Sequence, residues 1–293
     1  MLNLVAAHGL VTDLRVLPAR QAIVSWTTDA LLDTLEVTVH TRDGRSSRPL
    51  PYVVFEEGRR SSLDAFDDVA AIETDVVRAP AGIVALEVRS RHPLAYVTAS
   101  TPPADPPRAS PPAAAAQREL NVPERSQYAG AFPAERGWCA PASVAMLLGT
   151  WGAMPTVPDA AAGMFDSAYN GTGNWAFAAA YAGTHGLVGA VAYLRDLATV
   201  EAFIAAGLPL ALSITWRAGS LPGAPLERSD GHILVVRGFD ARGDVIVNDP
   251  AQPAVRHVYE RAAFARSWLG HGGVGLLVAP PERLHDLLRC ANA

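Results

Sequence analysis

Hydrophobic and polar positions alternate in short runs through the first hundred residues. Between residues 35 and 39, leucine and valine alternate with glutamate and threonine, which is the period of a half-buried strand. Further short apolar runs lie at residues 22–26, 53–55, 72–77, 83–88 and 94–98. Turn-forming stretches such as Asp43-Gly44 and Pro80-Ala81-Gly82 separate them. This spacing predicts an all-β, sandwich-like domain of about seven antiparallel strands over residues 1–100.

The pattern changes after residue 100. Residues 101–117 are nearly all proline, alanine and small polar residues. Such a composition buries too little apolar surface to offset the entropy of ordering, so the segment tends to be extended. We therefore predict an inter-domain linker over residues 101–118, with a short helix at its alanine run as the alternative.

Helical and strand periods are mixed in the rest of the chain. The apolar spacing predicts helices at residues 140–151, 175–183, 197–206, 261–269 and 284–290, with Asn174 placed to cap the second. Strands are predicted at residues 187–194, 210–216, 232–239, 245–248 and 274–278. Helices lead and strands follow, which indicates an α+β domain over residues 119–293.

The composition of the chain excludes several classes of function. The chain has 293 residues, 49% of them hydrophobic, and a formal net charge of -5, which indicates a globular protein of about two domains. No basic excess is available for a phosphate backbone, which argues against nucleic acid as a partner. No apolar run approaches the roughly 20 residues that span a bilayer, so no transmembrane segment is expected. The oligomeric state stays open.

The cysteines and the N-terminus bear on the compartment. The chain has only Cys139 and Cys290, which do not form a disulfide framework, and a reduced compartment fits better. The N-terminal run lacks a basic start, so no secretory signal is predicted and a cytoplasmic location is favoured, with export left open. No zinc pattern, phosphate loop or dinucleotide fingerprint occurs, and we expect neither a metal nor another cofactor.

Cys139 is the first candidate for chemistry. Pro141 follows it by two positions, and proline is favoured in the first turn of a helix, where the N–H that it lacks would have no partner. The cysteine therefore lies at a predicted helix N-terminus, where the helix dipole and free N–H groups stabilise a thiolate. A thiol so placed beside an imidazole is prepared as a nucleophile. The alternative is a buried structural cysteine.

His232 and Asp249 form the second candidate. If the turn between the strands at residues 232–239 and 245–248 centres on Ala241 and Arg242, His232 lies within about two residues of the position opposite Asp249. A carboxylate at that position can accept a hydrogen bond from one imidazole nitrogen and leave the other for the thiol. A surface His–Asp pair on a hairpin is the alternative.

These segments resemble a known family. The chain contains Gln127, then residues 137–143 reading Gly-Trp-Cys-Ala-Pro-Ala-Ser. Far downstream come Gly231-His232, four apolar residues, then residues 237–240 reading Arg-Gly-Phe-Asp and 248–250 reading Asn-Asp-Pro. In type and order these motifs resemble the bacteriocin-leader-processing (double-glycine) type of papain-like cysteine peptidase and its broad bacterial relatives. The resemblance covers residues 121–281 and leaves the predicted sandwich outside.

The resemblance implies a role for each matched residue. Cys139 would attack the scissile carbonyl, His232 would carry the proton, Asp249 would orient His232, and Gln127 would line the oxyanion hole together with the backbone N–H of Cys139. A solvated loop glutamine is the alternative for Gln127. Trp138 and Trp216 are candidates for lining the cleft, with core packing as their alternative.

The function expected from these motifs is that of a cysteine peptidase or amide hydrolase, acting on a peptide or peptide-like substrate through a thioester acyl-enzyme. The same Cys-His-Asp site would also serve an acyltransferase or transpeptidase. A catalytically inactive protein that binds peptides or the cell envelope is the alternative from a different class. The loop at residues 217–231 precedes His232 and is a candidate cover for the cleft.

Overall fold

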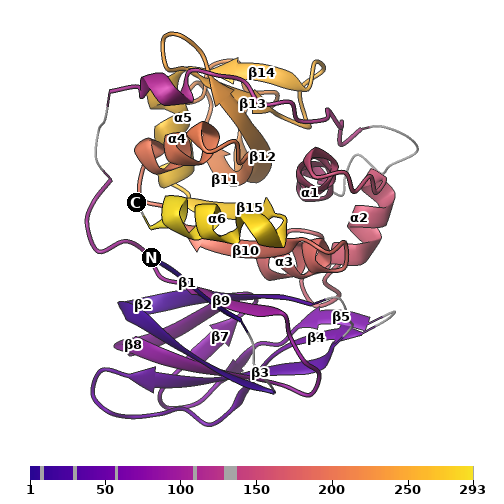
Figure 1. Cartoon of the computed structure of the whole chain (residues 1–293). Helices are drawn as coiled ribbons and strands as arrows, with labels where there is room; N and C mark the ends of the chain where they lie inside the picture. The colour runs from indigo at the N-terminus through magenta and orange to yellow at the C-terminus, as the bar shows by residue number, and fades with distance from the viewer. Residues whose placement is uncertain (7–9, 29–31, 57–58, 108–110, 129–136, 293) are drawn as a thin grey trace. The chain divides into compact units, whose positions relative to one another are not determined.

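A computed structural model describes residues 1–6, 10–28, 32–56, 59–107, 111–128 and 137–292 (Figure 1). Residues 108–110 of the predicted linker lie outside this range. The chain divides into two units, of which unit 1 contains Met1–Ala104 and Gly163–Tyr193 and unit 2 contains Asp105–Ala162 and Leu194–Ala293. Each unit is described by itself.

Unit 1 is built on antiparallel strands. They are β1 (Leu2–Ala6), β2 (Val11–Thr27), β3 (Leu32–Thr41), β4 (Leu50–Glu56), β5 (Arg59–Ser62), β6 (Ala65–Phe66), β7 (Ala71–Glu73), β8 (Val76–Ser90) and β9 (Tyr96–Ser100). They pair in the order β1-β9-β2-β8-β3-β4-β5, with β7 beside β8 and β6 beside β7. All described elements of the first hundred residues are therefore strands, as predicted, whereas their arrangement as a sandwich domain stays a prediction.

Two local predictions in this unit were wrong. The single strand predicted at residues 72–77 is split, because Thr74 has a φ of 57° and the chain reverses there between β7 and β8. The side chain of Asp64 stabilises this reversal by accepting a hydrogen bond from the Thr74 N–H at 2.8 Å. Conversely, the turn predicted at residues 80–82 lies inside β8, opposite a shift in the register of β2 between Arg15 and Ala19, so it is an irregularity of the strand.

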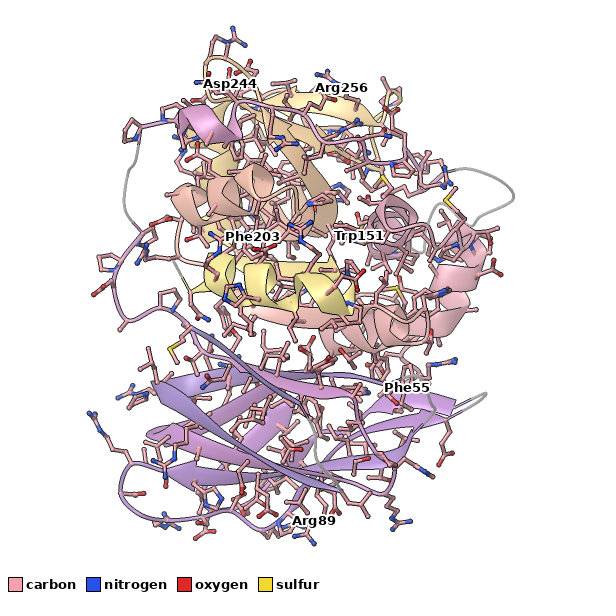
Figure 2. The ribbon with its side chains drawn as sticks, in the orientation of Figure 1. Phe55, Arg89, Trp151, Phe203, Asp244 and Arg256 are labelled. Atoms are coloured by element: carbon pink, nitrogen blue, oxygen red, sulfur yellow. The ribbon has the colours of Figure 1, made fainter. Side chains whose placement is uncertain are left out.

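Unit 1 also contains the later segment Gly163–Tyr193, with α3 (Trp175–Gly183) and β10 (Val188–Tyr193). The predicted cap is confirmed, because Asn174 Oδ1 accepts from the Phe177 N–H at 3.1 Å. The Phe177 ring lies 6.1 Å from the Trp26 ring and 5.5 Å from that of Phe55, a residue labelled in Figure 2. The segment thus groups with the N-terminal strands, although the boundary predicted at residue 119 assigned it to the second domain. That domain assignment stays a prediction.

Unit 2 carries the remaining elements. Its helices are η1 (Ala114–Ala116), α1 (Cys139–Thr150), α4 (Leu197–Ala205), α5 (Arg261–Leu269), η3 (Pro281–Arg283) and α6 (Leu284–Ala291), and α2 (Val157–Met164) spans the boundary between the units. Its strands are β11 (Leu210–Trp216), β12 (Ser229–Phe239), β13 (Val245–Asn248), β14 (Arg256–Tyr259) and β15 (Val274–Ala279), ordered β15-β11-β12-β13-β14.

The sequence prediction held for most of these elements. The predicted helices and strands of residues 119–293 agree with the structure to within three residues at each end. The sequence pattern missed α2 and β14, which are only 8 and 4 residues long. The alanine run of the predicted linker forms η1, the alternative noted above. No helix in the described part of the chain is long and apolar enough to cross a membrane.

Helix α1 is fixed at both ends. Near its start the buried Ser143 hydroxyl donates to the Ile233 carbonyl of β12 at 3.0 Å. Beyond its end the Trp151 indole, labelled in Figure 2, donates to the Val278 carbonyl of β15 at 2.9 Å. Residues 140–148 of the helix are all buried, so its N-terminus is held rigidly against the start of β12.

Candidate active site

Cys139 is the first residue of α1, as the sequence predicted. Gly137, just before the helix, has a φ of 56°, a conformation that glycine adopts without the strain that a side chain would bring. The Cys139 thiol is half-buried, and its Sγ lies 3.7 Å from the Gly137 carbonyl oxygen. Cys290 is also a free thiol, buried on α6.

The β12–β13 hairpin brings His232 and Asp249 together. Val235 pairs with Asn248 and Val236 with Val247, the register that a turn centred on Ala241 and Arg242 would give. The pairs beside the turn, Gly238 with Ile246 and Phe239 with Val245, differ from it by one residue, because the register shifts between Val236 and Gly238. Asp249 is therefore one step beyond the last pair and falls diagonally from His232. The imidazole Nε2 donates to Asp249 Oδ1 at 2.7 Å. The predicted contact between the two side chains is thus present, and Nδ1 is the ring nitrogen left for the thiol.

Asp249 is fully buried, and further donors satisfy its carboxylate. The Tyr259 hydroxyl donates to Oδ2 at 2.8 Å, and the Ala251 N–H donates to Oδ1 at 3.0 Å. Burial raises the pKa of Asp249, but the hydrogen bonds from His232, Tyr259 and Ala251 outweigh burial and hold the pKa below its usual value. Asp249 is therefore ionised at neutral pH.

Tyr259 is itself tied to the loop that precedes β12. Gln252 Nε2 donates to the Tyr259 hydroxyl at 3.2 Å and to the Gly223 carbonyl at 2.6 Å. Burial and the adjacent Asp249 charge raise the pKa of Tyr259, so its hydroxyl keeps the proton that it donates. The sequence pattern did not indicate either residue: Tyr259 ends the four-residue strand β14, and Gln252 lies in the irregular segment between β13 and β14.

Cys139 and His232 shift each other's ionisation. Burial raises the pKa of the Cys139 thiol, but the hydrogen bond and charge of His232, with the N–H groups of Ile233 and Ala140, lower the pKa below its usual value. Burial lowers the pKa of His232, but hydrogen bonds with Asp249 and Cys139 raise the pKa to about 10. These shifts favour a thiolate beside an imidazolium, the state of an activated nucleophile.

Gln127 lies beside the strand end that carries Asp249. Its backbone N–H donates to the Pro250 carbonyl at 2.9 Å. The side chain is largely buried, and its Oε1 has no hydrogen-bond partner within the described ranges. The structure thus brings Gln127 next to the His–Asp pair, and its place in an oxyanion hole stays a prediction.

The two tryptophans differ in exposure. Trp138 is half-buried at the N-cap of α1, where its carbonyl accepts from the Ala142 N–H at 3.1 Å. Trp216 is buried, and its ring stands edge-on to the His232 ring with centroids 5.5 Å apart. The Trp216 indole donates to the Leu226 carbonyl at 2.9 Å. Trp216 therefore packs against the imidazole and is bonded to the loop at residues 217–231. A cleft-lining role for Trp138 and Trp216 stays a prediction.

The site consists of groups suited to acyl transfer: a polarised thiol, a buried imidazole and a buried carboxylate. Over the ranges that the structure describes, no cluster of three or more histidine, cysteine or acidic residues is arranged to hold a metal ion.

Comparisons with known proteins bear on the same part of the chain. The model of the Peptidase_C39 like family matches residues 119–276. No curated protein matches. Among solved structures, a double glycine motif protease from an AMS/PCAT transporter, in complex with the leader peptide, is 18% identical with a TM-score of 0.39 and covers 59% of this chain and 99% of its own. A protein described as a C39-like peptidase from Bacillus anthracis is 16% identical, also with a TM-score of 0.39, and covers 55% of this chain and 98% of its own.

Proposed function

Because the chain belongs to the Peptidase_C39 like family, the family that its motifs resemble, we propose that it is a cysteine peptidase or amide hydrolase that works through a thioester acyl-enzyme. One observation carries the proposal. The Cys139 thiol lies at the start of α1 and interacts with His232, whose other ring nitrogen is 2.7 Å from Asp249.

In the first step the Cys139 thiolate attacks the carbonyl carbon of a peptide or peptide-like amide. A carbon–sulfur bond forms, and the carbonyl oxygen takes the electron pair of the carbonyl π bond. The Cys139 N–H and the Gln127 side-chain amide would donate hydrogen bonds to this oxyanion. The His232 imidazolium gives its proton to the amide nitrogen, and the carbon–nitrogen bond breaks to release an amine and leave a thioester.

In the second step His232, now neutral, takes a proton from water, and the hydroxide attacks the thioester carbonyl. The carbon–sulfur bond breaks, the acid leaves, and the thiolate and imidazolium are restored. Asp249 binds Nε2 and so leaves Nδ1 for the sulfur, and the Trp216 ring packs at right angles to the imidazole. Both residues thus fix the direction in which the proton moves.

Two reactions of the thiol test the proposal without knowledge of the natural substrate. Alkylation by iodoacetamide measures the thiolate, and acylation by p-nitrophenyl acetate measures attack on a carbonyl through release of p-nitrophenolate. We expect both at Cys139 near neutral pH, with the acetyl-enzyme seen by intact mass. His232→Ala should slow both, and Cys290→Ala should leave both unchanged. If Cys139 reacts no faster than free cysteine, the proposal fails.

The same experiment separates the rival functions. Glycinamide added to the acetyl-enzyme would yield acetylglycinamide if an amine resolves the thioester, as in an acyltransferase, and only acetate if water does. An inactive binding protein would give neither an ester burst nor an activated thiol. We expect acetate as the main product.

A further inference from the structure

Residues 118–127, which we call the strap, run along the β12–β13 hairpin and end at Gln127 (Figure 1). Pairing between β11 and β12 ends at Leu210 and Val236. At residues 237–239 the strap pairs with the edge of β12 in place of β11. The Leu120 N–H donates to the Arg237 carbonyl at 2.7 Å, and the Phe239 N–H donates to the Arg118 carbonyl at 3.1 Å.

Two buried side chains of the hairpin bind the strap's carbonyl groups. Arg237 Nε donates to the Leu120 carbonyl at 3.1 Å, and its guanidinium also donates to Asn248 Oδ1 at 2.8 Å. Asn248 is fully buried, and its Nδ2 lies 3.3 Å from the Val122 carbonyl oxygen and 3.2 Å from that of Pro123. The Arg237 and Asn248 side chains therefore bind the carbonyl groups of three strap residues, Leu120, Val122 and Pro123.

Acidic side chains of the strap face the same arginine. Arg237 lies 3.3 Å from Glu119 Oε1 and 3.4 Å from Glu124 Oε1. Arg256, labelled in Figure 2, binds Glu119 with two nitrogens at 2.7 and 2.8 Å. Because Arg237 is only 8% exposed, its ion pairs should stabilise the strap more than those of the half-exposed Arg256, which water screens.

The strap passes so close to residue 238 that only glycine fits there. A Cβ at this position would lie 2.2 Å from the Arg118 carbonyl oxygen and 2.9 Å from the Glu119 Cα. Both are backbone atoms, so a side chain at residue 238 must displace the strap.

The far end of the strap is fixed at the candidate site, where the Gln127 N–H donates to the carbonyl of Pro250, the residue after Asp249. We propose that Arg237, Gly238 and Asn248 are positioning residues that hold the strap and thereby place the Gln127 amide where the oxyanion forms. The inference rests on the proposed function. It gives a role to Arg237, Gly238 and Asn248 of the sequence motifs, which bind or closely approach the strap.

The test compares two reactions of the same thiol. Iodoacetamide is attacked at a CH2 group and forms no oxyanion, whereas p-nitrophenyl acetate forms one. Gly238→Ala and Asn248→Ala should slow acylation by more than about tenfold, toward the roughly 10²–10³-fold that a lost oxyanion donor costs. The alkylation rate should stay within about twofold, because the thiolate and His232 are untouched. Combining either substitution with Gln127→Ala should slow acylation no further than Gln127→Ala alone, because the effects of residues that act through the same group do not add.

Arg283→Ala is the matched control. Arg283 also donates to a backbone carbonyl, that of Ala206 at 2.7 Å, and pairs with Asp286 at 2.8 Å, and both partners lie outside the strap. It should leave both rates unchanged. Circular dichroism and the unfolding midpoint show whether each variant folds, and Arg237→Lys replaces Gly238→Ala if the latter does not.

Three results would overturn the inference: unchanged acylation in folded strap variants, a parallel loss of alkylation, or losses that multiply with that of Gln127→Ala. Failure of the proposed function looks different, since the unsubstituted protein would then show neither fast alkylation nor an ester burst. In that case the inference falls with the proposed function.

Discussion

Tyr259→Phe removes a single oxygen atom beside the candidate site. The Tyr259 hydroxyl donates to Asp249 Oδ2 at 2.8 Å and accepts from Gln252 at 3.2 Å. Phenylalanine keeps the ring, which stacks on Phe264 with centroids 6.1 Å apart. The change therefore deletes the hydrogen bond to a buried carboxylate and the weaker one from Gln252, whose Nε2 keeps the Gly223 carbonyl as a partner, and leaves the packing in place.

The expected cost follows from the charge of the acceptor. A hydrogen bond to a charged group contributes about 1.5–3 kcal/mol to stability. Asp249 is fully buried, so no water replaces the lost donor, and we expect the upper part of this range. With a shift of about 2–4 °C per kcal/mol for a body of this size, the unfolding midpoint should fall by about 5–12 °C.

The pH dependence of the stability loss shows whether it comes from the hydrogen bond to Asp249. The folded-state pKa of Asp249 is depressed, so its contribution to stability is present above the unfolded value of about 3.9 and is lost as the pH falls through the folded pKa. Tyr259→Phe removes one cause of the depression. The difference in unfolding free energy between the two proteins should therefore be largest near neutral pH and shrink toward acid.

Urea unfolding at a series of pH values measures this difference. Tyr193→Phe is a matched control, because the Tyr193 hydroxyl accepts from the neutral Gln21 amide at 3.1 Å. Loss of that neutral bond should cost about 0.5–1.5 kcal/mol with little pH dependence in acid. A Tyr259→Phe cost that is below that of the control, or constant with pH, would refute the reasoning.

Three further outcomes are expected. The alkylation rate of Cys139 should rise with pH, with a midpoint below the usual thiol pKa of about 8.5. His232→Ala should move this midpoint upward, because the hydrogen bond and charge of His232 then no longer lower the Cys139 pKa against the effect of burial. Stopped-flow iodoacetamide kinetics measure both midpoints. Ser143→Ala should lower the unfolding free energy by about 1–3 kcal/mol, because the Ile233 carbonyl loses its 3.0 Å partner; chemical denaturation checks this. Asp166→Ala in unit 1 leaves the N–H donors of Ser62, Ala168, Tyr169 and Asn174 without their buried acceptor, so calorimetry should show a loss of more than about 3 kcal/mol, while Cys139 alkylation at 25 °C stays unchanged.

The positions of the candidate thiol, histidine and aspartate could be predicted because each depended on local rules. Pro141 marks a helix start irrespective of the rest of the fold, and Cys139 is indeed the first residue of α1. The position of the turn predicted the hairpin register to within one residue: the pairs beside the turn centre on Arg242, and a register shift between Val236 and Gly238 then pairs Val235 with Asn248, as a centre at Ala241 and Arg242 would. The papain-like assignment, now supported by the family match, rested on motifs of the same local kind.

Other features depended on contacts that no local pattern encodes. Asn174 capped a helix as predicted, yet Phe177 of that helix packs with Trp26 and Phe55 of the N-terminal strands. Apolar periodicity shows that a face is buried but not which surface buries it. Tyr259 was missed for the same reason, since its contact with Asp249 depends on how β14 pairs with β13.

The strap shows how the spacing of a motif can mislead. Eleven residues separate Gln127 from Cys139. In papain-like enzymes the oxyanion-hole glutamine usually lies closer to the cysteine, so the spacing alone would argue against this role for Gln127. The structure fixes Gln127 from the other side, through the Pro250 carbonyl and the contacts of Arg237 and Asn248 with residues 118–124. The length of the intervening chain then matters little, because the hairpin that carries His232 also carries the groups that hold the strap. One hairpin would thus position both the proton carrier and the oxyanion donor, because Arg237 and Asn248, which hold the strap, lie between His232 and Asp249.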